Sequence, residues 1–424
     1  MNEQLQKTGQ VIVVWLVIVM ILRINSYFMI SESAAVTRVF KTGLRGALTG
    51  ICFLWIRHLN RSDEPTRFVV RNVLGLGLYL GYLFLGVASV MWSSDRFWSS
   101  LQLAMDFECV FFVWFYYKVL LIFNDQKRFS MRTSLDFIIW TSCSWVALGF
   151  LIGYFVNPDL FLRGTHGGEV QRLGGFIINP NELGMLLVVG SGCLYVHMMR
   201  TLKVTFWKIL GWLLMLIALL LTQSRSSLIS FFLTTLYFVF ASKRAKLIIP
   251  TIVIGTLAAP VIFMTIFVKE GDVGEVMSMT GRLPFWSDLL TYGFPERTMW
   301  GFGFMRIHYH ERFPSIHGFP GAMTHNTFVQ VVLNLGVAGA LTCFFQMLFV
   351  FRSVMRQTDP MLKHTFAGIF FGIFVNSLTE FGIFGDANYG IMWWLFVIYL
   401  NVLSADPRPI KQRYTPIYGL HAPR

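Results

Sequence analysis

The chain has 424 residues, of which 55% are hydrophobic and only 13% are charged, and its net charge is +13. A soluble protein of this size would carry about 25% charged residues, so the composition excludes a soluble globular domain and indicates a polytopic membrane protein. The positive charge does not point to nucleic acid, and we expect no such partner, because Lys and Arg collect on the cytoplasmic loops of membrane proteins.

Apolar runs recur along the whole chain. A transmembrane helix needs about 20 mostly apolar residues. The first run lacks a small-residue cleavage site and is followed by more spans, so it is typical of a retained anchor. We predict an all-α membrane domain over residues 1–424 with about twelve spans, near 11–30, 44–57, 72–92, 98–119, 135–156, 178–198, 205–222, 226–242, 247–268, 326–351, 364–380 and 388–404.

The basic residues predict the orientation of these spans. With a cytoplasmic N-terminus, most of the 35 Lys and Arg residues fall on cytoplasmic segments, loop after loop, and the C-terminus is cytoplasmic too. The long segment 269–325, between the ninth and tenth spans, then lies on the outer face, as does the turn with Glu380 and Asp386. The many Phe, Trp, Pro and Gly residues of the segment 269–325 indicate an ordered cap over a membrane-embedded site.

Arg225 lies in a tight turn between two apolar runs. An arginine near the bilayer is costly and usually functional, although it can also snorkel to lipid headgroups. Ser224, Ser226 and Ser227 suit a helix N-cap. A helix start beside a guanidinium group is a natural anion site, so we predict that Arg225 binds an anion.

Arg172 precedes two glycines and the element Asn179-Pro180-Asn181. Glycine allows close backbone approach, and Pro between two Asn suggests a broken or capped helix start. Irregular backbone at membrane depth is tolerated mainly where it lines a cavity. On these residues alone, a cavity-lining site and an ordinary Gly/Pro turn are equally open.

His325 and Asn326 immediately precede an apolar helix, with Thr324 as a possible cap. A lone histidine is more often structural, but this one lies at the membrane edge, at the end of the polar segment. There it could take a proton from an attacking hydroxyl group. Arg282 is either a second anion clamp or an exposed loop charge.

Other polar groups give weaker signals. The run His308-Tyr309-His310-Glu311 suggests a metal, but no third ligand is well spaced, so we expect no metal site. The five Cys residues follow neither a disulfide nor a zinc spacing. Asp106 and Glu108 lie inside the fourth predicted span, where they could pair with arginines or relay protons.

The sequence combines several arginines with one candidate base and has no nucleotide-binding or metal motif. This combination suits the transfer of a group from a diphosphate-linked donor to a hydroxyl group. Arginine would hold a diphosphate-linked donor and stabilise the leaving diphosphate. The histidine would activate an acceptor hydroxyl group.

Five short pieces of sequence, in this order and on one predicted face, resemble the family of O-antigen ligases and polymerases over about residues 160–345. The turn around Arg225 has Ser-Arg-Ser rather than the Ser-Arg-Gly of some members, and the long segment carries no large inserted domain. The pieces are Arg172-Leu173-Gly174-Gly175 with Asn179-Pro180-Asn181, then Thr222-Gln223-Ser224-Arg225-Ser226, then Gly281-Arg282 with Trp286, then Gly301-Phe302-Gly303, and His325-Asn326 with Gly336 and Gly339.

The resemblance implies a glycosyltransferase of the bacterial inner membrane with a GT-C-like helical fold. Such enzymes take a glycan from undecaprenyl diphosphate at the periplasmic face and need no metal or nucleotide sugar. Ligases pass it to the lipid A core in lipopolysaccharide biosynthesis, and polymerases pass it to another lipid-linked repeat. The resemblance implies that Arg172, Arg225 and Arg282 bind the diphosphate and that His325 is catalytic.

We add Asn181 and Asn326 as substrate-binding candidates. The ligase is our first hypothesis, slightly ahead of the polymerase. A transporter of polyprenyl-linked glycan could use the same arginines, but transporters often have paired broken helices. The sequence suggests a single interrupted element, near Asn179–Asn181, which favours the enzyme.

Overall fold

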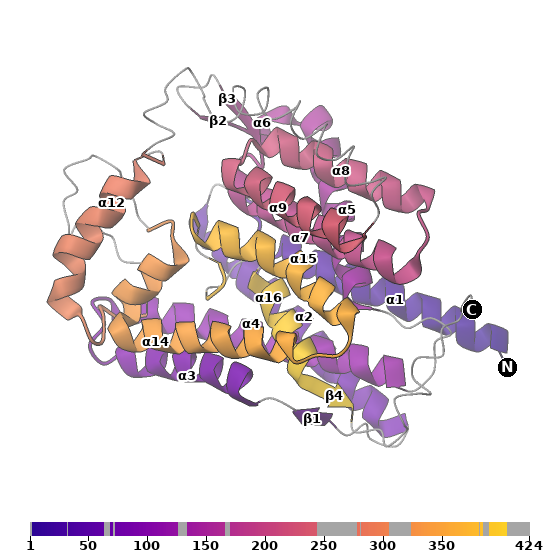
Figure 1. Ribbon diagram of the computed structural model, residues 1–424, viewed down its shortest axis with the longest axis horizontal. Coiled ribbons are helices and arrows are strands. Elements are labelled where there is room, and N and C mark those ends of the chain that lie inside the picture. The colour runs from indigo at the N-terminus through magenta and orange to yellow at the C-terminus, as the bar shows by residue number, and fades with distance from the viewer. Residues whose placement is uncertain are drawn as a thin grey trace.

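The computed structural model describes residues 2–31, 33–62, 68–70, 73–125, 134–165, 170–243, 278–279, 281–304, 324–380, 382–384 and 390–404. Within these ranges the chain is mostly helical (Figure 1). The main helices are α1 (Asn2–Asn25), α2 (Ala34–Ser62), α3 (Val73–Ser89), α4 (Arg96–Asp125), α5 (Leu135–Val156), α7 (Pro180–Thr201), α8 (Phe206–Thr222), α9 (Arg225–Ala241), α14 (Thr327–Met355), α15 (Pro360–Ser377) and α16 (Gly390–Asn401). Shorter helical pieces are α6 (Pro158–Phe161), α12 (Arg282–Asp288), the π-helix η4 (Leu289–Gly293) and the 3-10 helix η5 (Phe294–Arg297).

Four of the described helices, α2, α5, α7 and α14, contain stretches long and apolar enough to cross a membrane. Shorter apolar stretches occupy α3, α8, α9, α16 and the second half of α1. This is the make-up of a polytopic membrane protein, in agreement with the composition. The expected span 247–268 lies outside the described residues, so the total of twelve spans and the GT-C-like arrangement stay predictions.

The second helix is much longer than the expected span 44–57. It runs from Ala34 to Ser62. Three basic residues in its first half, Arg38, Lys41 and Arg45, interrupt the apolar pattern there and hide the true start of the helix. A helix boundary cannot be read where charges break the hydrophobic run.

Two short antiparallel ladders depart from the expected all-α fold. Strand β1 (Phe68–Val70) pairs with β4 (Val402–Ser404), and β2 (Leu162–Thr165) pairs with β3 (Val170–Leu173). Strands of three or four residues give too little alternation to be recognised in a sequence. The last residues of the expected span 388–404 form the strand β4 and are not helical. The sequence could not indicate this strand, since its partner β1 lies more than three hundred residues earlier.

Helix α7 packs among α5, α8, α9 and α15. It crosses α15 at two glycines, and a Cβ atom on Gly192 would lie 2.2 Å from the carbonyl oxygen of Gly368. The two helices run in opposite directions, so the start of α7 and the end of α15 meet at the same end of the bundle. Asn181 and Glu380 lie at nearly equal distances along the chain from this crossing, which places them side by side.

Helix α14 is broken at Gly336, whose φ of 61° and ψ of −154° are not helical. The break exposes two carbonyl groups, and a separate segment satisfies them: Phe302 N donates to Leu333 O at 2.8 Å, and Gly303 N donates to Asn334 O at 2.9 Å. Irregular backbone at membrane depth requires such partners. The expectation of a single interrupted element near Asn179–Asn181 is therefore wrong, because α7 simply begins there and the break lies inside α14.

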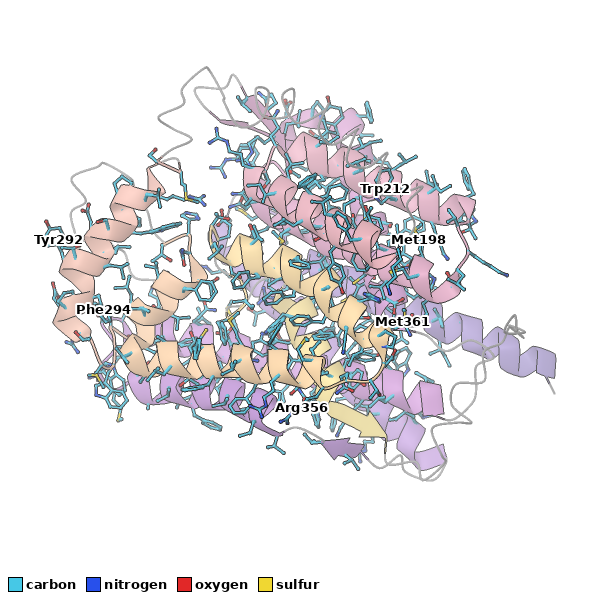
Figure 2. All side chains as sticks on the ribbon, viewed as in Figure 1. Met198, Trp212, Tyr292, Phe294, Arg356 and Met361 are labelled. Carbon is cyan, nitrogen blue, oxygen red and sulfur yellow. The ribbon has the colours of Figure 1, made fainter. Side chains whose placement is uncertain are left out.

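The predicted outer and cytoplasmic segments lie at different ends of the bundle. Figure 1 shows α12 and the β2–β3 hairpin at one end and the start of α1 and β4 toward the other. In Figure 2, Tyr292 and Phe294 lie near the broken part of α14 around Gly336, and Arg356 lies at the C-terminal end of this helix. Which of the two ends faces the cytoplasm stays a prediction from the basic residues.

Candidate functional site

Glu380 lies just beyond the end of α15, at the centre of a polar cluster. Its side chain is only 4% exposed. Its backbone N–H donates to Asn376 O at 2.7 Å, and its carbonyl oxygen accepts from Thr327 Oγ1 at 3.0 Å. The carboxylate is therefore held in place, and groups from three other segments of the chain converge on it.

His325 is the first of these groups. Its Nδ1 lies 2.9 Å from Glu380 Oε2. An ionised carboxylate can only accept a hydrogen bond, so in the neutral imidazole Nδ1 carries the proton and Nε2 carries the lone pair. The pairing makes Nε2 the basic atom of the ring. The backbone of His325 has a φ of 48°, a conformation that a non-glycine residue adopts at some energetic cost and that often marks a functional site.

Both neighbours of His325 are fixed by hydrogen bonds. Asn326 is the N-cap of α14: its Oδ1 accepts two backbone N–H groups at 2.9 and 3.1 Å, and its Nδ2 donates to Leu378 O at 3.1 Å. The carbonyl oxygen of Thr324 accepts from Trp286 Nε1 at 2.6 Å. Asn326 is the cap, and the prediction of Thr324 as the cap was wrong. The imidazole is thus presented from a rigid stretch of backbone.

Arg282 is the first residue of α12 and reaches the same carboxylate. Its Nη2 lies 3.2 Å from Glu380 Oε1, and its Nη1 donates to the carbonyl oxygen of Thr379. Gly281, with a φ of 77°, provides the turn just before it. Of the two alternatives left open, the exposed loop charge is excluded, because Arg282 joins α12 to the end of α15.

Arg172 and Asn181 approach from the other side. Arg172 on β3 donates from Nε to Thr222 O at 2.9 Å and from Nη2 to Asn181 Oδ1 at 2.7 Å. Asn181 Nδ2 in turn donates to Glu380 Oε1 at 2.7 Å. Asn181 sits in the first turn of α7, where Asn179 is the N-cap and Pro180 follows it, as the sequence indicated.

Arg225 is the first residue of α9. Ser224 is the N-cap, and its side chain accepts a backbone N–H from the first turn. Ser226 Oγ donates to Asn376 Oδ1 at 3.2 Å, which ties this turn to the end of α15. The charge of Arg225 is also close enough to lower the pKa of Arg172. Arg225 therefore belongs to the same cluster.

The cluster is strongly positive around Arg172. Burial lowers the pKa of this guanidinium group to about 10. The positive charges of Arg225, Arg163 and Arg282 act in the same direction, and the carboxylate of Glu380 opposes them. Three like charges within range of one half-buried arginine indicate a site that favours an anion.

The pKa of Glu380 is lowered as well, which for a carboxyl group favours the charged form. Burial, the largest single effect, would raise its pKa, but the hydrogen-bonded and charged groups around it together outweigh burial, with His325 first among them. Arg282 and Asn181 add to the lowering, so the pKa lies below its ordinary value of 4.5. Glu380 is therefore ionised at neutral pH and can orient the imidazole.

The structure thus brings all six predicted site residues to one place. Sequence reasoning missed the central role of Glu380. The available signal was an acidic residue at the end of an apolar helix, on the predicted face of the arginines, but nothing in the sequence connected it to His325. The six predicted residues are Arg172, Asn181, Arg225, Arg282, His325 and Asn326.

Residues 210–344 match the O-antigen ligase family model. The match confirms the family resemblance. It spans about a third of the chain and contains Arg225, Arg282 and His325, whereas Arg172 and Glu380 lie outside it. None of the curated proteins compared with the chain matches it.

A separate hollow of about 680 Å³ lies between the end of α3 and the segment 296–301. Trp92 and Trp300 line it, and its charged groups are Glu296 and Arg297. It contains none of the six predicted residues and no histidine. We therefore take the Glu380 cluster, and not this hollow, as the candidate functional site.

Of the remaining polar candidates, the structure describes Asp106 and Glu108, and both lie on α4, away from the cluster. Glu108 accepts from Arg23 at 2.6 and 2.7 Å and from Thr49 at 2.6 Å, so it pairs with an arginine between α1, α2 and α4. Asp106 is buried in α4. His308-Tyr309-His310-Glu311 lies outside the described residues. Among the residues that are described, no group of three His, Cys, Asp or Glu side chains is placed to hold a metal ion.

Proposed function

We propose that the protein is an inner-membrane glycosyltransferase that moves a glycan from undecaprenyl diphosphate to an acceptor hydroxyl group at the periplasmic face. We propose further that it is an O-antigen ligase, with the lipid A core as acceptor. The family match supports glycan transfer, because the matched stretch contains the histidine and two of the arginines.

One observation carries this proposal. A continuous chain of hydrogen bonds runs from Arg172 through Asn181 and Glu380 to His325. It joins a cationic group to a histidine whose basic nitrogen is defined by a carboxylate. An anion-binding group and a general base at one place are what a transfer from a diphosphate needs.

In the proposed reaction, His325 Nε2 takes the proton of the acceptor hydroxyl group as its oxygen attacks the anomeric carbon of the donor. The new C–O bond forms as the bond to the diphosphate breaks, and the electron pair leaves with the diphosphate oxygen. Direct displacement inverts the anomeric centre. The imidazolium that forms is stabilised by Glu380.

Arg172, Arg225 and Arg282 hold the diphosphate and stabilise the charge that it gains on leaving. Guanidinium groups match the planar geometry of phosphate oxygens and stay charged at neutral pH. In this proposal they supply the positive charge that a divalent cation provides in other phosphate-dependent enzymes, and no cofactor takes part. Asn181 and Asn326 position Arg172 and His325 rather than contact the reacting atoms.

Two alternative functions, polymerase and transporter, would use the same cluster. A polymerase differs only in its acceptor, which would be a second lipid-linked repeat. A glycan-lipid transporter gains some support from the break at Gly336, because broken helices are common in transporters. The pairing of His325 with Glu380 favours the enzyme, since translocation of a lipid headgroup needs no oriented base.

The test is glycan transfer by the purified chain in detergent, where the two sides of the membrane no longer exist. With a lipid-linked glycan and lipid A core, the wild-type protein should form the joined product. His325→Ala and Arg225→Ala should abolish it, whereas the exposed controls His58→Ala and Arg297→Ala should not. Transfer at the wild-type rate by either site variant would exclude the proposal.

The lipopolysaccharide of a deletion strain separates ligase from polymerase. Loss of long chains together with accumulated lipid-linked polymer indicates a ligase. A core that carries a single repeat indicates a polymerase.

A further inference from the structure

Two arginines face each other directly across the β2–β3 hairpin. Arg163 on β2 pairs with Arg172 on β3, next to the Leu162–Leu173 pair in the antiparallel register. Side chains of directly opposed residues leave an antiparallel ladder on the same face, with Cα atoms about 4.5–5.5 Å apart. Arg163 therefore accompanies Arg172 on the face that leads to the Glu380 cluster.

This pairing is unfavourable in the absence of a ligand. Like charges directly opposed in a sheet destabilise it. Arg163 also contributes to the lowered pKa of Arg172, so the repulsion between the two groups is felt at the site. A hairpin that holds two guanidinium groups together in this way is suited to an anion that contacts both.

The two arginines differ in how accessible their guanidinium groups are to a ligand. Arg172 is half-buried and uses Nε and Nη2 to contact Thr222 and Asn181. Arg163 is exposed, although its backbone is fixed by the ladder. A guanidinium group binds one phosphate through two parallel hydrogen bonds. A headgroup with two phosphates therefore gains from a second, accessible arginine beside the first.

We propose that Arg163 is a substrate-binding residue that acts with Arg172 as a two-arginine clamp, and that this clamp makes the site select a lipid diphosphate over a lipid monophosphate. The inference rests on the proposed function, because it assumes that the donor carries a diphosphate. It adds a fourth arginine, from a hairpin that lies outside the matched family stretch.

The first test is binding by the full chain in detergent, with undecaprenyl diphosphate and undecaprenyl monophosphate as probes. Arg163→Gln should weaken binding of the diphosphate by about tenfold or more and change binding of the monophosphate by less than about twofold. Arg163→Lys keeps the charge but loses the planar fork, so its affinity should lie in between. The matched control is Arg297→Gln, an exposed arginine on another segment, which should bind both lipids as the wild type does.

A second measurement separates binding from structural support. Because Arg163→Gln removes a like-charge pair, its thermal unfolding midpoint without lipid should equal or exceed that of the wild type. Added diphosphate lipid should then raise the midpoint less than in the wild type, since at equal concentration a more weakly bound ligand stabilises the folded state less. A lowered midpoint without lipid would assign Arg163 a structural role and overturn the inference.

The possible failures are distinct. If the wild type binds the diphosphate and Arg163→Gln binds it equally well, the clamp is excluded and the proposed function stands. If Arg163→Gln loses both lipids to the same extent, the selectivity is excluded. If the wild type neither binds the diphosphate lipid nor transfers glycan, the proposed function fails and the clamp fails with it.

Discussion

Glu380 Oε2 lies 2.9 Å from His325 Nδ1, although 55 residues separate the two along the chain. The same carboxylate accepts from Asn181 and Arg282 through its other oxygen. One buried acid therefore fixes the orientation of the proposed base and the position of one proposed phosphate ligand. The behaviour of the site depends on this shared contact.

Replacing Glu380 by Gln should slow transfer by about 10²–10⁴-fold, mainly through kcat. The amide of Gln can donate to Nδ1, which would move the proton to Nε2 and remove the basic atom. Transfer rates over a range of acceptor concentrations would separate kcat from KM. Glu380→Asp should recover part of the activity because it keeps the charge. Equal rates for wild type and Glu380→Gln would exclude the positioning role.

The variants His325→Ala and Arg225→Ala should both lose glycan transfer, but only Arg225→Ala should also lose lipid binding. His325→Ala removes the base, so transfer should fall by at least about 10²–10⁴-fold while undecaprenyl diphosphate binds within about twofold of the wild-type affinity. Arg225→Ala should lose both transfer and binding, because the guanidinium group contacts the headgroup in the proposal. Lipid binding measured beside transfer would show the difference. Loss of lipid affinity in His325→Ala would contradict the assignment.

The ionised Glu380 should stabilise the fold in a pH-dependent way. Its pKa in the folded protein lies below the ordinary value of 4.5, so its contribution is fully present above that value and is lost as the pH falls through the folded pKa. The difference in thermal unfolding midpoint between wild type and Glu380→Gln should be constant near neutral pH and shrink below about pH 4.5. A difference that grows on acidification would have the wrong sign.

The break in α14 should tolerate no side chain. Ala at Gly336 requires a positive φ and places Cβ 2.4 Å from the carbonyl carbon of Met299, so we expect a loss of at least about 2 kcal/mol. Thermal unfolding in detergent would measure it. The matched control is Gly149→Ala in α5, where a Cβ meets nothing within 4 Å and helix propensity favours Ala. Similar midpoints for the two variants would show that the break is not constrained.

Local signals in the sequence located much of the site. The Asn179-Pro180 pair marks the start of α7, and Ser224 marks the start of α9. In each case an N-cap signal fixes a helix end, and a residue directly after it, Asn181 or Arg225, becomes part of the cluster. The composition likewise identified the membrane class, because few charges and long apolar runs need no knowledge of contacts.

Features that depend on distant contacts could not be predicted in this way. Glu380 gains its role from residues 55 to 199 positions away, and a single sequence carries no record of such pairings. The break at Gly336 arises from the close approach of Met299 on a separate segment. The pairing of β1 with β4 joins residues 68–70 to the C-terminal end of the described chain. Each requires the fold before it can be seen.

The late position of Glu380 has a consequence for biogenesis. Asn181 contacts a carboxylate that lies 199 residues further along the chain. While the ribosome is still translating the earlier helices, the nascent protein holds Arg172 and Arg225 without the acid that organises them. In the proposed reaction, transfer can begin only after α15 has been inserted, so a prematurely terminated product would occupy the membrane without using the proposed lipid-linked donor.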